Sequence, residues 1–312
     1  MDSEASLNTL TLRTTYQDPC KRMMNAKGGV QWTEARSPDK EAVGGQWRGA
    51  MGAVTVNGVH LEYRLEGASR GETLALAHSL GTDLTLWDGV AEILGRERRI
   101  LRWDLRGHGG SGAPAGEYRL AEFAAEAVAL FDSLGVRRAH FAGVSLGGMI
   151  GMQLALQAPE RIGKLILSNT AARIGARQGW EDRIRLALEG GMAAVAEGVA
   201  ERWFTAGYRG AHPESVARVV GLLTSTSRQG YAASCAAIRD ADLTNDLRRI
   251  QTPALIVAGT EDPTTTPQDG RMLERGIAGA RYRELPGAHL TPVELPEEFS
   301  AAVRDFLAGE AA

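Results

Sequence analysis

The sequence predicts an α/β fold: an eight-stranded, mostly parallel sheet that is flanked by helices and carries an inserted helical cap. Short apolar runs alternate with helical patterns along most of the 312 residues, which is typical of parallel strands joined by crossover helices. One stretch of about 75 residues between two of these runs has no strand signal, and we expect it to be helical. The chain is therefore expected to consist of an N-terminal extension at 1–51, an alpha/beta core at 52–170 and 246–312, and a cap at 171–245.

The N-terminal extension differs from the rest of the chain. It is polar, lacks hydrophobic periodicity, and has seven basic and six acidic residues among its first fifty. We expect this extension to be disordered. Its acidic residues argue against a mitochondrial transit peptide. Met51 directly precedes the first expected strand. Either translation begins at Met51 or the extension is a genuine tail, and both interpretations stay open.

The core begins with a hairpin. Its strands are expected at 52–56 and 59–65, and Asn57-Gly58 between them favours a type I′ turn. The elements expected next are a strand at 74–77, a helix around 87–94, a strand at 100–103, a helix around 120–134, and strands at 139–142, 165–168, 254–258 and 281–285.

The most informative motif is the pentapeptide Gly143-Val144-Ser145-Leu146-Gly147, which lies between an apolar strand and an apolar helical pattern. A Gly-x-Ser-x-Gly sequence in this setting is typical of a nucleophile elbow, a sharp turn that holds a serine in strained backbone geometry. The flanking glycines let the turn pack closely. Amides at the start of the following helix favour negative charge near the serine. We therefore predict that Ser145 is a catalytic nucleophile.

An acid and a base follow the serine in the chain order that hydrolases with this elbow require. The next-to-last strand ends in a turn that contains Glu261 and Asp262. Asp262 is favoured as the catalytic acid because Pro263 restricts the backbone and can aim the carboxylate. Glu261 remains the alternative. The last strand is followed by a loop that contains His289, which is the expected catalytic base.

The backbone amides of Leu80 and Leu146 are the expected oxyanion donors. In this kind of site one donor is the residue after the nucleophile, and the other comes from an earlier strand-to-helix loop. Leu146 follows Ser145, and Leu80 lies in the loop directly after the strand at 74–77.

Two turn-rich loops contain further polar residues. His78 and His108 are expected to shape these loops rather than to transfer protons. Asp104 and Arg106 lie after the strand at 100–103, and their expected role is to pair and brace the loop.

Composition narrows the functional class. The net charge of −3 argues against nucleic acid or an anionic membrane as the main partner. Cys20 and Cys235 have no paired spacing, which argues against a disulfide framework and a zinc site and indicates a reducing compartment. No run of eighteen apolar residues and no signal-peptide pattern is found, so we expect a cytoplasmic protein. Oligomeric state is not predicted.

The expected cap combines aromatic and basic side chains. These are Trp180, Trp203, Phe204, Tyr208 and Tyr231, with Arg173, Arg177, Arg183, Arg185, Arg202, Arg209 and Arg239. Most are expected to be core aromatics and solvated arginines. Such a mixture can also form an apolar pocket with one cation for an anionic substrate.

From about residue 54 to 308 the chain resembles the 3-oxoadipate enol-lactonases, alpha/beta-hydrolases of the beta-ketoadipate pathway of aromatic breakdown. Outside the cap, the similar stretches are residues 79–83 with Trp87, the elbow extended to Gly151, and residues 158–161. In and around the cap they are residues 169–175, 191–194, 201–205, 230–232 and 237–243. Cap sequences diverge fastest among these hydrolases, so the cap stretches are the more specific. The chain departs from the family at His78, in the acid loop 262–267, at Pro292 and in its N-terminal extension.

The resemblance implies hydrolysis of 3-oxoadipate enol-lactone to 3-oxoadipate by a Ser-His-Asp triad through an acyl-enzyme. It implies a small-molecule lactone substrate and no metal or organic cofactor. The acetate arm of this substrate calls for a cation. Arg173 is the expected cation and Trp180 the expected pocket wall, because both lie early in the cap near the strand end beside the nucleophile.

Other functions remain open. A carboxylesterase, a carbon–carbon bond hydrolase or a cofactor-free perhydrolase can share the triad and differ in the cap. A catalytically weak receptor of the same fold is a further alternative, although an intact triad argues against it. Epoxide hydrolases and dehalogenases need aspartate at the elbow, so Ser145 excludes their mechanism.

Overall fold

The computed structural model describes residues 42–43, 46–47, 49, 51–69 and 71–309. The N-terminal extension expected at 1–51 lies almost entirely outside these residues, so its disorder stays a prediction.

The described residues form one sheet of ten strands, of which the first two contain only two residues each. The strands are β1 (Ala42–Val43), β2 (Gln46–Trp47), β3 (Met51–Val56), β4 (Val59–Gly67), β5 (Thr73–Ala77), β6 (Arg99–Trp103), β7 (Ala139–Val144), β8 (Ile162–Ser168), β9 (Ala254–Gly259) and β10 (Arg281–Leu285). Their order is β1-β2-β4-β6-β5-β7-β8-β9-β10, with β3 paired to β4. The eight longer strands are the ones that the sequence predicts.

The sheet is parallel from β6 to β10 and antiparallel at its N-terminal edge. The predicted hairpin is confirmed: β3 and β4 pair with Val56 opposite Val59, and Asn57 and Gly58 both have positive φ, at 50° and 80°. Both angles fit a type I′ turn.

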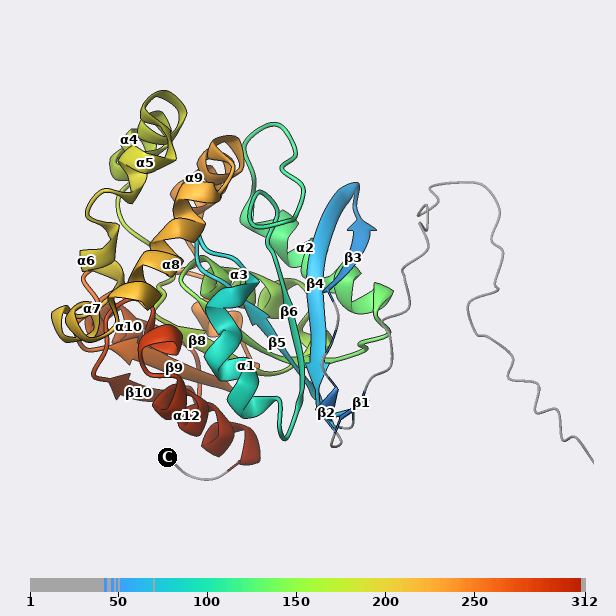
Figure 1. Ribbon diagram of the computed structural model, residues 1–312. Helices are drawn as coiled ribbons and strands as arrows, with labels where there is room; N and C mark the ends of the chain where they lie inside the picture. The colour runs from blue at the N-terminus through green and yellow to red at the C-terminus, as the bar shows by residue number, and fades with distance from the viewer. Residues whose placement is uncertain (1–41, 44–45, 48, 50, 70, 310–312) are drawn as a thin grey trace, which may run out of the picture. The chain divides into compact units, whose positions relative to one another are not determined.

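Helices cover both faces of the sheet. In Figure 1, α1 (Asp88–Leu94) and α12 (Pro296–Ala308) lie together on one face, and α2 (Leu120–Ser133) and α3 (Leu146–Gln157) lie together on the other. The remaining core helices are η1 (Leu84–Trp87), η2 (Pro159–Arg161), η4 (Leu247–Arg249), α10 (Pro267–Gly276) and α11 (Thr291–Glu294).

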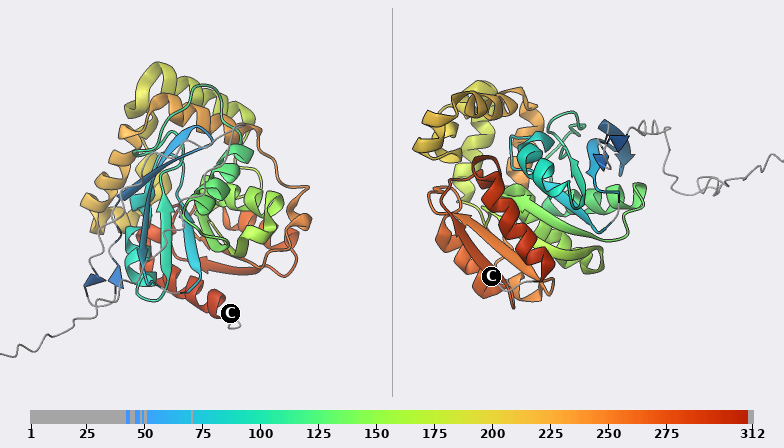
Figure 2. Two further views of the ribbon diagram at one scale, coloured as in Figure 1. Left: turned by 90° about the vertical axis from the view of Figure 1, so that its right-hand side faces the viewer. Right: turned by 60° about the horizontal axis from the view of Figure 1, so that its bottom comes forward.

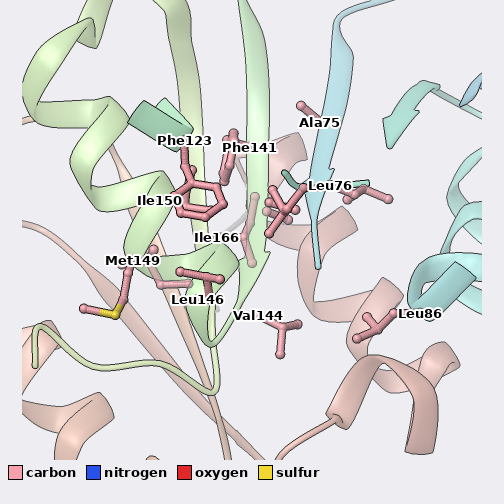
Figure 3. Close-up of a cluster of buried hydrophobic side chains, with 14 of the residues drawn as sticks. Ala75, Leu76, Leu86, Phe123, Phe141, Val144, Leu146, Met149, Ile150 and Ile166 are labelled. Carbon is pink, nitrogen blue, oxygen red and sulfur yellow. The ribbon is translucent and has the colours of Figure 1, made fainter. Parts of the chain in front are cut away.

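The central strands are buried on both faces because helices cover the sheet from both sides. Every residue of β5, β7 and β9 is buried. Figure 3 shows the apolar cluster around the middle of the sheet, where β5 contributes Leu76, β7 contributes Phe141, and α3 contributes Leu146 and Ile150. This packing fixes the position of the carboxyl ends of the strands, where sheets of this kind carry their sites.

A helical insertion separates β8 from β9. Its helices are α4 (Arg177–Arg185), η3 (Leu186–Gly190, a π-helical turn), α5 (Gly191–Ala196), α6 (Val199–Trp203), α7 (Ala206–Ala211), α8 (Pro213–Ser225) and α9 (Arg228–Asp240). They are the yellow and orange helices gathered at one end of the sheet in Figure 2. Every residue from 230 to 238 in α9 is buried, and Tyr118 N–H donates to the Ala233 carbonyl at 3.1 Å. Helix α9 is therefore packed directly against the core.

Candidate active site

Ser145 occupies the turn between β7 and α3, as the pentapeptide predicts. Its backbone angles are φ 56° and ψ −114°, which is strained for a residue with a side chain. A Cβ on Gly143 would lie 2.1 Å from the Gly147 carbonyl oxygen, and a Cβ on Gly147 would lie 2.2 Å from the Ala77 carbonyl oxygen. The turn therefore closes only because both positions are glycine.

The strained turn is also tied to the end of β8. The Ser145 N–H donates to the Ser168 carbonyl at 3.0 Å, and the Thr170 hydroxyl donates to the Ser145 carbonyl at 2.7 Å. The serine is 6% exposed. These contacts hold the hydroxyl-bearing residue at the carboxyl edge of the sheet.

Asp262 and His289 meet although they follow different strands. Asp262 lies after β9 and His289 after β10, and the imidazole Nδ1 donates to Asp262 Oδ2 at 2.8 Å. Both side chains are buried. Because Nδ1 carries the proton, Nε2 is the basic nitrogen of His289. The neighbouring Glu261 is exposed, so the structure favours Asp262 over this alternative.

The Asp262 carboxylate is kept ionised. Burial by itself would raise its pKa, but favourable electrostatic interaction with His289 and hydrogen bonds from His289, Asn169 and Thr265 outweigh burial and lower the pKa to about 2. The second oxygen, Oδ1, accepts the backbone N–H groups of Thr264 and Thr265 at 2.8 and 3.1 Å. An ionised acid at this position can orient and stabilise an imidazolium.

Asn169 links the acid to the histidine loop, a role that the sequence reasoning missed. Its side-chain amide donates to Asp262 Oδ2 and to the Ala288 carbonyl, both at 3.0 Å. Its own oxygen accepts the Thr291 hydroxyl at 2.6 Å. A usable signal was present, since polar side chains at the carboxyl end of a buried parallel strand lie where such sheets carry their sites.

Glu294 links the histidine loop to the helical insertion. One carboxylate oxygen accepts the Ala288 N–H at 3.0 Å, and the other accepts the Thr205 N–H at 3.2 Å and the Thr205 hydroxyl. Nearby, the Leu290 N–H donates to the Trp203 carbonyl at 3.1 Å. Nothing local in the sequence marks Glu294 for this role.

The two predicted oxyanion donors lie on neighbouring segments, because the close approach of Gly147 to Ala77 brings the start of α3 against the loop after β5. Within the described chain the Leu80 N–H has no acceptor. Leu146 is the first residue of α3, so its N–H has no partner within the helix. Both amides are available to an incoming oxygen atom.

The structure does not join the serine to the histidine directly. Within the described residues, no hydrogen bond connects the Ser145 hydroxyl to His289 Nε2. Catalytic hydrogen bonds of this kind often tighten only when substrate is bound.

Within the described residues, neither of the two predicted substrate-binding residues makes a hydrogen bond or an ion pair with the triad residues. The Arg173 side chain is 56% exposed and lies 3.7 Å from the Asp242 carboxylate. It lines a surface groove of about 390 Å³ whose described lining includes none of the triad residues. Trp180 is buried, and its Nε1 donates to the Ile174 carbonyl at 2.6 Å.

The predicted pairing of Asp104 with Arg106 is wrong. Asp104 accepts the backbone N–H groups of Leu84 and Gly110, both at 2.8 Å. Arg106 instead pairs with two carboxylates of α2, those of Glu122 and Glu126. Both residues brace the loop: Asp104 binds the amides of Leu84 and of Gly110 in its own loop, and Arg106 binds two carboxylates of α2.

The described residues contain neither a metal-binding cluster nor a membrane-spanning helix. No group of three or more His, Cys, Asp or Glu side chains there could hold a metal ion. No helix in that part of the chain is long and apolar enough to cross a membrane. Cys235 is buried and unpaired.

Such an arrangement can perform nucleophilic acyl transfer. It combines a serine on a strained turn, a histidine oriented by an ionised aspartate, and two backbone amides, at a helix start and in a neighbouring loop, that have no acceptor within the described residues.

Known proteins share this fold and this sequence pattern. A family model described as alpha/beta hydrolase fold matches residues 72–294. The chain is 37% identical to 3-oxoadipate enol-lactonase 2 of Acinetobacter baylyi, over 80% of this chain and 94% of that protein. The crystal structure of the enol-lactonase from Burkholderia xenovorans matches with a TM-score of 0.81 and 41% identity, over 82% of this chain and 99% of that one.

A second group of relatives carries a different name. The chain is 30% identical to a putative carbamate hydrolase RutD of a Caulobacter species, over 84% of this chain and 100% of that protein. Since the family model spans most of the chain and two kinds of hydrolase align with it, the protein belongs to the alpha/beta hydrolase fold family and is a hydrolase related to the 3-oxoadipate enol-lactonases.

Proposed function

We propose that the protein hydrolyses 3-oxoadipate enol-lactone to 3-oxoadipate through an acyl-enzyme on Ser145. The reaction class is supported by the elbow serine together with the buried Asp262–His289 pair. The substrate is supported by one observation above all, the 37% identity to a 3-oxoadipate enol-lactonase over nearly the whole length of that relative.

In the first half of the reaction Ser145 attacks the lactone carbonyl. His289 Nε2 takes the hydroxyl proton, and Asp262 stabilises the imidazolium that forms. The amides of Leu80 and Leu146 bind the oxyanion, and by analogy with other oxyanion holes each donor lowers the barrier by about 3 to 4 kcal/mol. The ring C–O bond then breaks and the ring oxygen leaves as an enolate, which takes up the proton held on His289 Nε2 and becomes the ketone, so that His289 is again a free base.

In the second half water attacks the acyl-enzyme. His289 accepts a proton from the water, the ester bond to Ser145 breaks, and the proton returns to the serine oxygen. The products are a carboxylate and regenerated enzyme, so no oxidant, reductant or cofactor is consumed.

The direct test follows the loss of ultraviolet absorbance of enzymatically generated 3-oxoadipate enol-lactone. Wild type and Ser145→Ala are compared side by side after their folding is checked by circular dichroism. We expect fast turnover by wild type and a loss of at least about 10⁴-fold in the variant. If wild type ignores the lactone but hydrolyses aryl esters or carbamates through Ser145, the triad assignment holds and the substrate assignment is wrong.

A further inference from the structure

Two buried histidines connect the loop after β5 to the loop after β6. His78 Nε2 accepts the N–H of Leu105 at 2.9 Å, and His108 Nε2 accepts the N–H of Gly81 at 3.0 Å. Each bond runs from a side chain of one loop to the backbone of the other. The two rings also contact each other edge to face, with centroids 5.2 Å apart. We call this four-residue arrangement the histidine clamp.

The hydrogen-bond partners determine the protonation of both rings. A backbone N–H can only donate, so Nε2 of each ring must carry a lone pair. The protons therefore lie on Nδ1, where His78 donates to the Ser79 carbonyl at 2.8 Å and His108 donates to the Arg106 carbonyl at 3.0 Å. Burial lowers the pKa of His78 to about 4, and burial together with neighbouring His78 lowers the pKa of His108 to about 3. Both rings are neutral near pH 7.

The two histidines of the clamp restrain the peptide units on both sides of Leu80, His78 through Nδ1 and His108 through Nε2. In a planar trans peptide, the Ser79 carbonyl and the Leu80 N–H point in opposite directions, so fixing one fixes the other. The Ser79 carbonyl accepts His78 Nδ1–H, the Thr82 N–H at 3.2 Å and the Thr82 hydroxyl at 2.9 Å. The following peptide is held by the bond from Gly81 to His108. The Leu80 N–H, which has no acceptor in the described chain, thus keeps a single direction.

We propose that His78 and His108 are positioning residues that hold the Leu80 N–H in the direction needed to bind the oxyanion. This inference rests on the proposed serine hydrolase mechanism and explains how one of its donors is preorganised. Preorganised donors are effective because they need no reorientation as charge develops in the transition state. At position 78 the decisive bond is donated by Nδ1, whereas at position 108 the decisive bond is accepted by Nε2.

Asparagine and glutamine substitutions separate these two bonds. Asparagine places an amide near the Nδ1 position of histidine, and glutamine places one near the Nε2 position. His78→Asn keeps a donor to the Ser79 carbonyl and His108→Gln keeps an acceptor for Gly81. His78→Gln and His108→Asn remove those bonds while keeping a polar side chain of similar size. We therefore expect a crossed pattern of activity among the four variants: asparagine is tolerated at position 78 but not at position 108, and glutamine is tolerated at position 108 but not at position 78.

The assay uses p-nitrophenyl acetate, so it does not depend on the lactone. His78→Gln and His108→Asn should lower kcat about tenfold, less than the 10²-fold or more expected when an oxyanion donor is removed outright. KM should stay within about twofold, because a donor aimed at the oxyanion acts mainly in the transition state. His78→Asn and His108→Gln should retain most of the wild-type kcat.

Inhibition by phenylboronic acid, which forms a tetrahedral adduct with an active serine, provides the second readout. Its affinity should fall in parallel with kcat in the two impaired variants. Equal kcat values and equal boronic acid affinities across the four folded variants would overturn the proposal, since general destabilisation of the loop does not produce a crossed pattern. Ser145→Ala separates the two hypotheses: if it keeps wild-type activity the serine mechanism itself fails, whatever the histidine variants show.

Discussion

The two sides of the site are held in place by different means. Ser145 is held mainly by backbone geometry, through a positive φ and the close approaches at Gly143 and Gly147. Asp262 and His289 are held mainly by side-chain hydrogen bonds, among them those of Asn169 and Thr265 to the acid. A backbone constraint needs particular residues within a few positions, so it appears as a short motif. A side-chain network recruits residues from anywhere in the chain, so it leaves no such motif.

The largest loss of activity should come from replacing the acid, which belongs to the part of the site that side-chain hydrogen bonds hold in place. Asp262→Asn should lower kcat by about 10⁴-fold, because an amide cannot hold the required imidazole tautomer or stabilise its charged form. The matched control is Glu261→Gln at the exposed neighbouring carboxylate, which should stay within about twofold of wild type. Steady-state kinetics with either a lactone or an aryl ester measure kcat for both variants. The reverse ranking of the two variants would make Glu261 the acid.

A glycine substitution tests the part of the site around Ser145 that backbone geometry holds in place. Gly147→Ala places a Cβ 2.2 Å from the Ala77 carbonyl oxygen, so the elbow or the loop after β5 must shift. Misplacement by about 1 Å can cost 10²-fold in rate, and we expect a loss of this size together with a lower Tm.

The control for this variant is Gly221→Ala in α8. A Cβ at Gly221 meets no atom within 4 Å, so the change should leave activity intact and favour the helix by about 0.5–1 kcal/mol. Thermal melts and kcat are measured for both variants. Wild-type kcat and Tm in Gly147→Ala would show that the elbow tolerates a side chain there.

The stability of the acid–base side should depend on pH. The pKa of Asp262 is lowered from 3.8 to about 2, so the folded state binds fewer protons than the unfolded state between these values. The resulting contribution, about 2 kcal/mol, is fully present above about pH 4 and is lost as the pH falls toward 2. Urea unfolding of wild type and Asp262→Asn from pH 6 to pH 3 measures it. The difference between their free energies of unfolding should become smaller as the pH falls. A difference that stays constant would show that the hydrogen bonds to Asp262 do not lower its pKa.

The smallest effect, a change in KM, should come from a residue of the helical insertion that belongs to neither of these two parts of the site. If Arg173 binds the substrate carboxylate, Arg173→Ala should raise KM for the carboxylated lactone several-fold, a modest change because its side chain is more than half exposed. Arg185→Ala, which removes another exposed arginine of the insertion, is the control and should leave KM unchanged. An unchanged KM in Arg173→Ala would exclude this residue as the carboxylate-binding cation.

The sequence by itself determined the elements whose cause is local. The eight longer strands, the hairpin turn at Asn57-Gly58 and the elbow at Ser145 follow from apolar runs, turn residues and glycine positions that lie close together in the chain. The order of Ser145, Asp262 and His289 was also readable, since each follows a recognisable strand. Local sequence predicts these features because burial pattern and backbone strain act over only a few residues.

Only the tertiary structure decided which side chains meet. Asn169 bonds to Asp262 across 93 residues and to the Ala288 carbonyl across 119, and Glu294 reaches Thr205 across 89. The histidine clamp joins two loops across 27 residues, whereas the expected pairing between Asp104 and Arg106, only two positions apart, does not form. A buried polar group takes whatever partner the packed fold brings within about 3 Å, and sequence distance does not enter that requirement.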